Sequence, residues 1–223
     1  MALNYYKNEL KENAQLLASK GKGILAVDES TKTVGKRLAG IGVENTEENR
    51  KAYRGMLFTT EGLGKYISGA ILFEETLYQN HQDGESMVKK LNDLGIIPGI
   101  KVDKGLNPLP GAGDVETFCS GLDGLVERAA KYYEQGARFA KWRAVLQITN
   151  DGCPSKLSIQ ENAWGLARYA RSVQESGLVP IIEPEILMDG DHTIEKTAEV
   201  QEEVIKQVYI ACQANGVFLE GTL

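Results

Sequence analysis

Charged residues follow short apolar runs at several places in the chain, and three of these places carry two charges at positions i and i+2. The pairs are Lys101 with Asp103, Lys141 with Arg143, and Glu183 with Glu185, and Asp28 follows a further apolar run. Residues at i and i+2 of an extended chain point to the same side. Lysine and arginine can hold phosphates, neighbouring cations can lower the pKa of a lysine toward nucleophilic values, and paired carboxylates can divide acid and base roles.

These charges have two interpretations. A charge next to an apolar core must be paired or functional. The seven charges could form an ion-pair layer that closes one end of a barrel, or they could line a reaction site. Their number and mixed sign favour the reaction site.

A repeated unit positions the charges: a helix-like stretch, a glycine, and then an apolar run. Glycine is common just after helix ends, and apolar runs that follow it are typical of strands. The pattern predicts six strands, after Gly23, Gly64, Gly95, Gly136, Gly177 and Gly216. The glycines lie 31 to 41 residues apart, which leaves room for a crossover helix in each interval and therefore predicts a parallel sheet.

Helical stripes fill the intervals. Leu125, Ala129 and Tyr132 form one stripe, and Ser158 with Glu161 resembles a capping box at the start of a helix that runs to Ser176. A third helix is predicted over residues 193–215.

The fold class predicted is α/β, with a doubly wound sheet and a (β/α)8 barrel as the alternatives. Charges at the ends of many strands favour the barrel, because a doubly wound sheet concentrates its chemistry at one switch point. The 223 residues hold about six strand-helix units, whereas such barrels usually take about 250 residues or more. We therefore expect residues 1–223 to form a single, incomplete TIM-barrel domain that lacks the last two units.

Composition excludes several classes of function. A net charge of −6 argues against a nucleic-acid partner, and no apolar run is long enough for a membrane helix. The polar N-terminus predicts no targeting segment. Three distant cysteines and two histidines show no metal-ligand spacing, so we expect no metal and surface positions for His81 and His192. Lys36 and Arg37 fit either a solvated basic helix face or a phosphate contact.

Six segments resemble class I fructose-bisphosphate aldolase, in order and with similar spacing. They are LAVDEST (25–31), ILFEETL (71–77), GIKVDKG (99–105), FAKWR (139–143), VPIIEPEI (179–186) and LEGTL (219–223). The resemblance covers essentially the whole chain. Residues 62–70 and 163–169 look most like the plant-plastid and algal branch.

The resemblance implies a lyase that reversibly splits fructose 1,6-bisphosphate into dihydroxyacetone phosphate and glyceraldehyde 3-phosphate, in glycolysis, gluconeogenesis or the Calvin cycle, without a cofactor. It implies proton transfer at the 4-hydroxyl by Asp28, acid/base work in carbinolamine dehydration by Glu183, and assistance from Lys141. The resemblance also places Glu185 among the catalytic residues, through charge pairing. The substrate-binding residues that it implies are Lys101, Arg143, Ser30, Thr33, Lys36 and Arg37.

One departure bears on activity. In the family, the LEGTL motif runs on into the Schiff-base lysine, which would come two residues beyond Leu223, so we expect a chain truncated just before that lysine and inactive alone. The alternative is a non-catalytic aldolase-like protein that binds phosphates or partner chains. The resemblance further implies a phosphorylated sugar as substrate, a homotetramer for the full-length family, and a cytoplasmic or plastid-stroma location.

Overall fold

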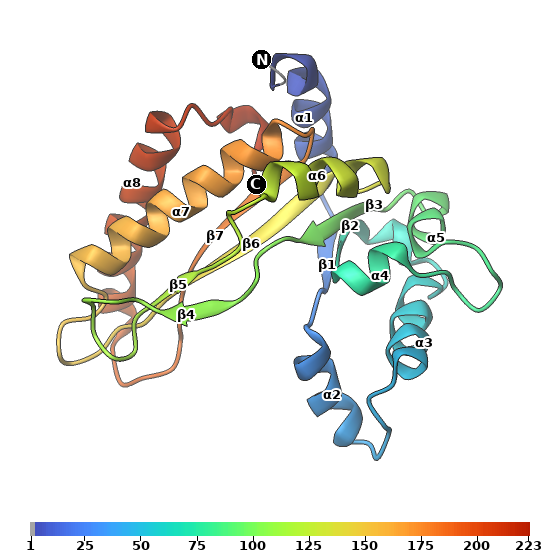
Figure 1. Ribbon diagram of the computed structural model, residues 1–223, viewed down its shortest axis with the longest axis horizontal. Helices are drawn as coiled ribbons and strands as arrows, with labels where there is room; N and C mark the ends of the chain where they lie inside the picture. The colour runs from blue at the N-terminus through green and yellow to red at the C-terminus, as the bar shows by residue number, and fades with distance from the viewer. Residues whose placement is uncertain (1–2) are drawn as a thin grey trace.

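The computed structural model describes residues 3–223 and has a parallel sheet at its centre (Figure 1). Five strands form it in the order β1-β2-β3-β6-β7. Their bounds are β1 Gly23–Val27, β2 Ile67–Leu72, β3 Ile97–Lys101, β6 Phe139–Leu146 and β7 Val179–Ile186. A short antiparallel hairpin, β4 Leu106–Pro108 with β5 Thr117–Cys119, lies between β3 and β6 in the sequence.

Helices fill the connections between the strands. They are α1 Leu3–Leu17, α2 Thr31–Ala39, α3 Glu47–Phe58, α4 Glu74–Tyr78, α5 Met87–Asp93, α6 Leu125–Glu134, α7 Lys156–Gln174 and α8 Ile194–Ala214, with the 3-10 turns η1 Leu63–Lys65 and η2 Leu219–Gly221. Each parallel strand pairs with the next one along the chain, as expected of strand-helix repeats. Residues 3–223 therefore form a five-stranded segment of a (β/α)8 barrel. None of the helices in this described range is both long and apolar enough to cross a membrane.

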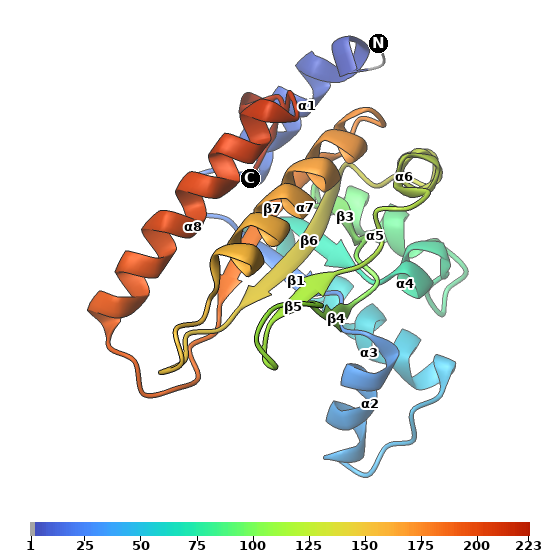
Figure 2. The same cartoon turned by 60° about the vertical axis from the view of Figure 1, so that its left-hand side comes forward.

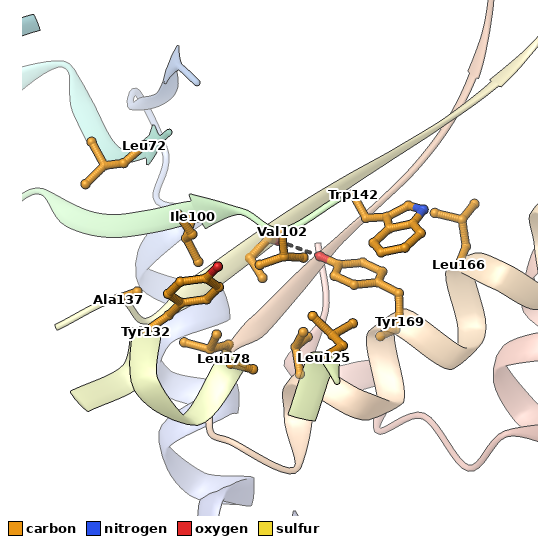
Figure 3. Packing of buried hydrophobic residues seen from close by; sticks show 14 of the residues in the cluster. Leu72, Ile100, Val102, Leu125, Tyr132, Ala137, Trp142, Leu166, Tyr169 and Leu178 are labelled. Atoms are coloured by element: carbon orange, nitrogen blue, oxygen red, sulfur yellow. Dashed lines mark hydrogen bonds between the residues drawn. The ribbon is translucent and has the colours of Figure 1, made fainter. Parts of the chain in front are cut away.

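The main core lies between the sheet and its outer helices (Figure 3). Trp142 of β6 stacks on Tyr169 of α7 with ring centroids 5.3 Å apart, and the Tyr169 hydroxyl donates to the Ala140 carbonyl at 2.7 Å. The predicted stripe Leu125, Ala129 and Tyr132 is buried on α6. This layer covers one face of the sheet, as a barrel requires.

A second core lies at the amino-terminal ends of the strands, where α1 packs (Figure 2). Leu10 and Leu17 of α1 are buried with Phe139 and Val179 there. The Phe139 ring occupies space that only glycine leaves free, because a Cβ at Gly99 would lie 2.3 Å from ring atoms. Helix α1 thus closes this end of the sheet and leaves the carboxyl ends of the strands open.

The prediction of a sixth strand after Gly216 is wrong. The segment after Gly216 forms η2, and only Leu223 bonds to β7, donating to the Pro180 carbonyl and accepting from the Ile182 amide. The buried Gln174 side chain provides the reason. It donates to the Phe218 and Gly221 carbonyls and accepts from the Phe218 amide, so it satisfies backbone groups that a strand ladder would otherwise use.

Two local predictions also need correction. Helix α7 begins earlier than the Ser158–Glu161 pattern predicted, because Ser155 caps it by accepting from the Ser158 amide at 3.1 Å. Strands β6 and β7 run on past their predicted ends to Leu146 and Ile186, so their charged residues lie within the strands. The helix predicted over 193–215 is confirmed as α8, with Thr193 as its cap.

Candidate active site

The carboxyl ends of the parallel strands bring most of the predicted site residues together. A cavity of about 300 Å³ opens there, between the end of β1, the end of β3 and β6. Its lining includes Asp28, Ser30, Thr33, Lys101, Asp103, Lys141 and Arg143. The predicted convergence of charges from separate strands is therefore present in the structure.

Strand register explains how the charges meet. Lys101 of β3 pairs in register with Lys141 of β6, and Arg143 pairs with Glu183 of β7. Their side chains alternate with buried apolar ones, as the burial of Trp142 between Lys141 and Arg143 shows. Each i, i+2 pair therefore points to the open side of the sheet, away from the helix layer.

Lys141 lies between two carboxylates. Its ammonium is 3.2 Å from Asp28 Oδ2 and 3.6 Å from Glu183 Oε2, and its side chain is only 15% exposed. Burial opposes the charged form, but the charges of Asp28 and Glu183 outweigh burial and raise the pKa of Lys141. The possibility that neighbouring cations lower the pKa of a lysine is therefore not met at Lys141, whose two carboxylates favour the ammonium.

Glu183 has the opposite balance. Desolvation by burial raises its pKa above the ordinary glutamate value, and Lys141 and Arg143 offset this only in part. A carboxyl group with a raised pKa retains its proton to higher pH and can donate it. Glu183 thus combines a raised pKa with a neighbouring ammonium.

Two further ion pairs frame the site. Arg143 binds both carboxylate oxygens of Glu185 through its Nε and Nη2 atoms, with Nη2 2.8 Å from Oε1, and this bond raises the pKa of Arg143. Lys101 contacts the carboxylate of Asp103, whose other contact is the Gly105 amide at 3.1 Å. Lys101 and Arg143 both line the cavity, where their side chains could contact an anionic group.

The predicted residues of α2 divide between two places. Ser30 and Thr33 lie at the cavity, where Ser30 caps α2 by accepting from the Thr33 amide. Lys36 is exposed on α2, and Arg37 contacts Glu29 and lies 3.4 Å from the Tyr53 hydroxyl. Neither of these two side chains lines the cavity.

The histidines lie apart from this site. His81 and His192 are half-buried, in contrast to the surface positions predicted, and His81 Nδ1 is 3.2 Å from Asp83 Oδ1. Within residues 3–223, no three His, Cys, Asp or Glu side chains gather as metal ligands would.

Two arginines that the sequence analysis did not include support the site from outside, whereas Asp103, to which the i, i+2 pattern assigns no role, lines the cavity itself. Arg54 of α3 and Arg128 of α6 donate to the Glu29 and Val102 carbonyls, each adjacent in sequence to a site residue. An arginine in an amphipathic helix carries no sequence signal that separates such a contact from an exposed position.

A parallel strand-helix sheet with lysines and carboxylates gathered at the carboxyl ends of its strands is typical of (β/α)8-barrel enzymes. Comparison with known proteins identifies the family: the pattern described as "Fructose-bisphosphate aldolase class-I" matches residues 9–223. The chain belongs to the class I fructose-bisphosphate aldolase family.

Individual relatives agree with this assignment. Fructose-bisphosphate aldolase 3, chloroplastic, of Arabidopsis thaliana is 59% identical over 98% of this chain, and the match covers 55% of the relative's own length. The chloroplastic fructose-bisphosphate aldolase of Spinacia oleracea is 58% identical over 97% of this chain and is covered to 54%. The chain spans about half the length of the curated relatives that it matches.

A solved structure extends the similarity to the fold. Fructose-bisphosphate aldolase from Plasmodium falciparum, in a co-crystal with TRAP and a small-molecule inhibitor, superposes with a TM-score of 0.96 at 56% identity. The match covers 98% of this chain and 63% of that chain. The resemblance stated from six sequence segments is therefore confirmed at the level of family and fold.

Proposed function

We propose that this chain provides part of the active site of a class I fructose-bisphosphate aldolase, which cleaves fructose 1,6-bisphosphate reversibly into two triose phosphates. The observation that carries the proposal is the contact of Lys141 with both Asp28 and Glu183 at the open ends of the strands. Family membership supplies the reaction, and this geometry supplies groups that can move protons in it.

The roles follow from charge and distance. Asp28 is the proton acceptor at the 4-hydroxyl, and Glu183, with its raised pKa, is the proton donor for carbinolamine dehydration. Lys141 stays charged between them and stabilises negative charge that develops on substrate oxygens. Glu185 orients Arg143 through the two-sided ion pair.

Phosphate binding is assigned to the cations and hydroxyls of the cavity. Lys101, Arg143, Ser30 and Thr33 surround it. Lys36 and Arg37 are proposed as peripheral phosphate contacts, reached only after Arg37 leaves Glu29.

Residues 1–223 are proposed to form a single domain, an incomplete barrel; with five strands in its parallel sheet, the sixth strand is missing as well as the last two strand-helix units. The protein is proposed to act in the plastid stroma, because the Arabidopsis and spinach relatives are chloroplastic. A homotetramer remains our proposal for the assembled enzyme.

Imine chemistry needs a nucleophilic lysine, which the resemblance puts two residues beyond LEGTL. Lys141 is a poor substitute because its raised pKa keeps the amine protonated. A polypeptide of residues 1–223 alone is therefore expected to show no meaningful cleavage. The alternative function, a non-catalytic phosphate-binding protein, is favoured by the same cavity cations.

The test compares two polypeptides: residues 1–223 alone, and the protein expressed at the full length of its native transcript, called the native-length protein below. Each is incubated with dihydroxyacetone phosphate and borohydride, and peptides are mapped by mass spectrometry. Cleavage activity with an adduct in the native-length protein supports the proposal. Phosphate binding without cleavage or adduct in that protein would favour the alternative, and an adduct on Lys141 with turnover would overturn the roles given above.

A further inference from the structure

Arg54 is the most deeply buried charged side chain in the described residues that the proposed mechanism does not use. It lies on α3 and has 0% of its surface exposed. Desolvation by burial lowers its pKa, which shows that its surroundings oppose the charge. A buried cation in this position requires specific partners to be retained.

The partners of Arg54 come from two different strand ends. Nη2 donates to the Glu29 carbonyl at 2.6 Å, and Nη1 donates to Thr76 Oγ1 at 2.9 Å. Its ion pair with Glu75 is longer, at 3.4 Å, and the Phe73 ring lies 5.5 Å from the guanidinium carbon. One planar side chain thus ties the segment after β1 to helix α4, which follows β2.

The carbonyl that Arg54 holds belongs to the residue directly after Asp28. Glu29 stands between Asp28 and Ser30, which caps α2 and lines the cavity. A shift of this peptide unit moves the Asp28 carboxylate relative to Lys141 and also moves the cap of α2. Helix α3 therefore controls the geometry of the turn from outside the cavity.

We propose that Arg54 is a positioning residue, which fixes the 28–30 turn by its hydrogen bond to the Glu29 carbonyl and so sets the placement of Asp28 against Lys141. Its part in turnover rests on the proposed aldolase function, whereas its hold on the turn does not.

Arg50 offers a matched control one helical turn away. It binds the same carboxylate, with Nη2 2.5 Å from Glu75 Oε1, and is also largely buried. Its remaining donors go to Asn45 and not to the turn after Asp28. Arg50→Met therefore removes an ion pair with Glu75 while it leaves the Glu29 carbonyl bonded.

The experiment compares Arg54→Met, Arg54→Lys and Arg50→Met in the native-length protein. Hydrogen exchange of the amides of residues 28–34 is expected to accelerate at least tenfold in Arg54→Met and to stay within twofold of wild type in Arg50→Met. In cleavage of fructose 1,6-bisphosphate, kcat is expected to fall about 10- to 100-fold in Arg54→Met with KM within about threefold, because displacements near 1 Å cost about that much. Arg54→Lys keeps the charge beside Glu75, but a single ammonium cannot reach both the Glu29 carbonyl and the Thr76 hydroxyl. It should therefore show the same faster exchange of the amides of residues 28–34.

Equal exchange and equal kcat for Arg54→Met and Arg50→Met would overturn the proposal, since both would then act only through the Glu75 ion pair. If Arg54→Met does not fold, Arg54→Lys decides by the same two measurements. A wild-type protein without cleavage activity would refute the proposed function, while the exchange comparison would still decide the role of Arg54.

Discussion

Replacing Asp28 by asparagine removes the nearer of the two carboxylates that hold Lys141 as an ammonium. The atoms involved, Lys141 Nζ and Asp28 Oδ2, are 3.2 Å apart, and both side chains are at most 15% exposed. At this separation the attraction is about 1.3 kcal/mol in water and about 5 kcal/mol at an effective dielectric constant near 20. Even the smaller value corresponds to nearly a tenfold change in the ratio of neutral to charged amine.

We therefore expect the neutral fraction of Lys141 at a given pH to rise about tenfold or more in Asp28→Asn. Desolvation, the largest single influence on the pKa of Lys141, lowers it. In the variant only the Glu183 carboxylate, instead of two carboxylates, opposes this lowering. The assay is competitive labelling of lysines with trace acylating reagent between pH 7 and pH 12, read by peptide mass spectrometry in the native-length protein. Lys101, which pairs with Asp103, serves as the internal control.

The same substitution has a signature in stability. The pKa of Lys141 is raised in the folded state. The pairing of Lys141 therefore stabilises the fold fully at pH values below the pKa of an unfolded lysine, and this stabilisation is lost as pH rises through the pKa of the folded state. Asp28→Asn should therefore cost most at neutral pH and least at the alkaline end of the range. Labelling of Lys141 that stays within twofold of wild type would refute the electrostatic account of this site.

Three other outcomes are expected. In Glu183→Gln, stability relative to wild type should rise between pH 4 and pH 8, because a carboxyl with a raised folded pKa destabilises the fold once it must ionise. Calorimetry at the two pH values checks this, and a constant difference between variant and wild type would contradict it. Gly99→Ala should destabilise the fold by about 1 to 3 kcal/mol through the clash with the Phe139 ring. Gly165→Ala, which has open space at its Cβ, should not destabilise it. Denaturant unfolding of both variants tests this, and equal midpoints would contradict the packing argument. A polypeptide of residues 1–223 alone should self-associate because β1 and β7 present strand edges; a monodisperse monomer in sedimentation would show that these edges are protected.

The sequence predicted those elements whose signals are local. Five strands follow their glycines as expected, and the helix expected over 193–215 is present as α8. The strand expected after Gly216 failed because a side chain distant in sequence, Gln174, takes its backbone bonds. Such competition depends on tertiary packing, which composition and periodicity do not encode.

The site shows the same division. The i, i+2 spacing predicted which side of the sheet would carry Lys141, Arg143 and Glu183, and the strand register confirmed it. The raised pKa of Lys141 could not be predicted from its own strand, because the nearest opposite charges are Asp28, directly after β1, and Glu183 of β7. The place of Arg54 could not be predicted either, since its burial follows from how α3 lies against two strand ends.

The packing of α1 has a consequence for the order in which this chain assembles during synthesis. Strands β1, β2, β3, β6 and β7 each dock on the strand made just before, so the sheet can grow while the ribosome is still translating. Helix α1 cannot finish in this way: its Leu3 amide bonds to Glu175, 172 residues later, and its apolar side also packs against Phe218 and Leu223. At about 5 to 20 residues per second, α1 waits on the order of 10 to 40 seconds after its own synthesis for its last neighbours. During that interval its apolar side is open to chaperones, and the N-terminal segment is among the last to gain its full set of native contacts.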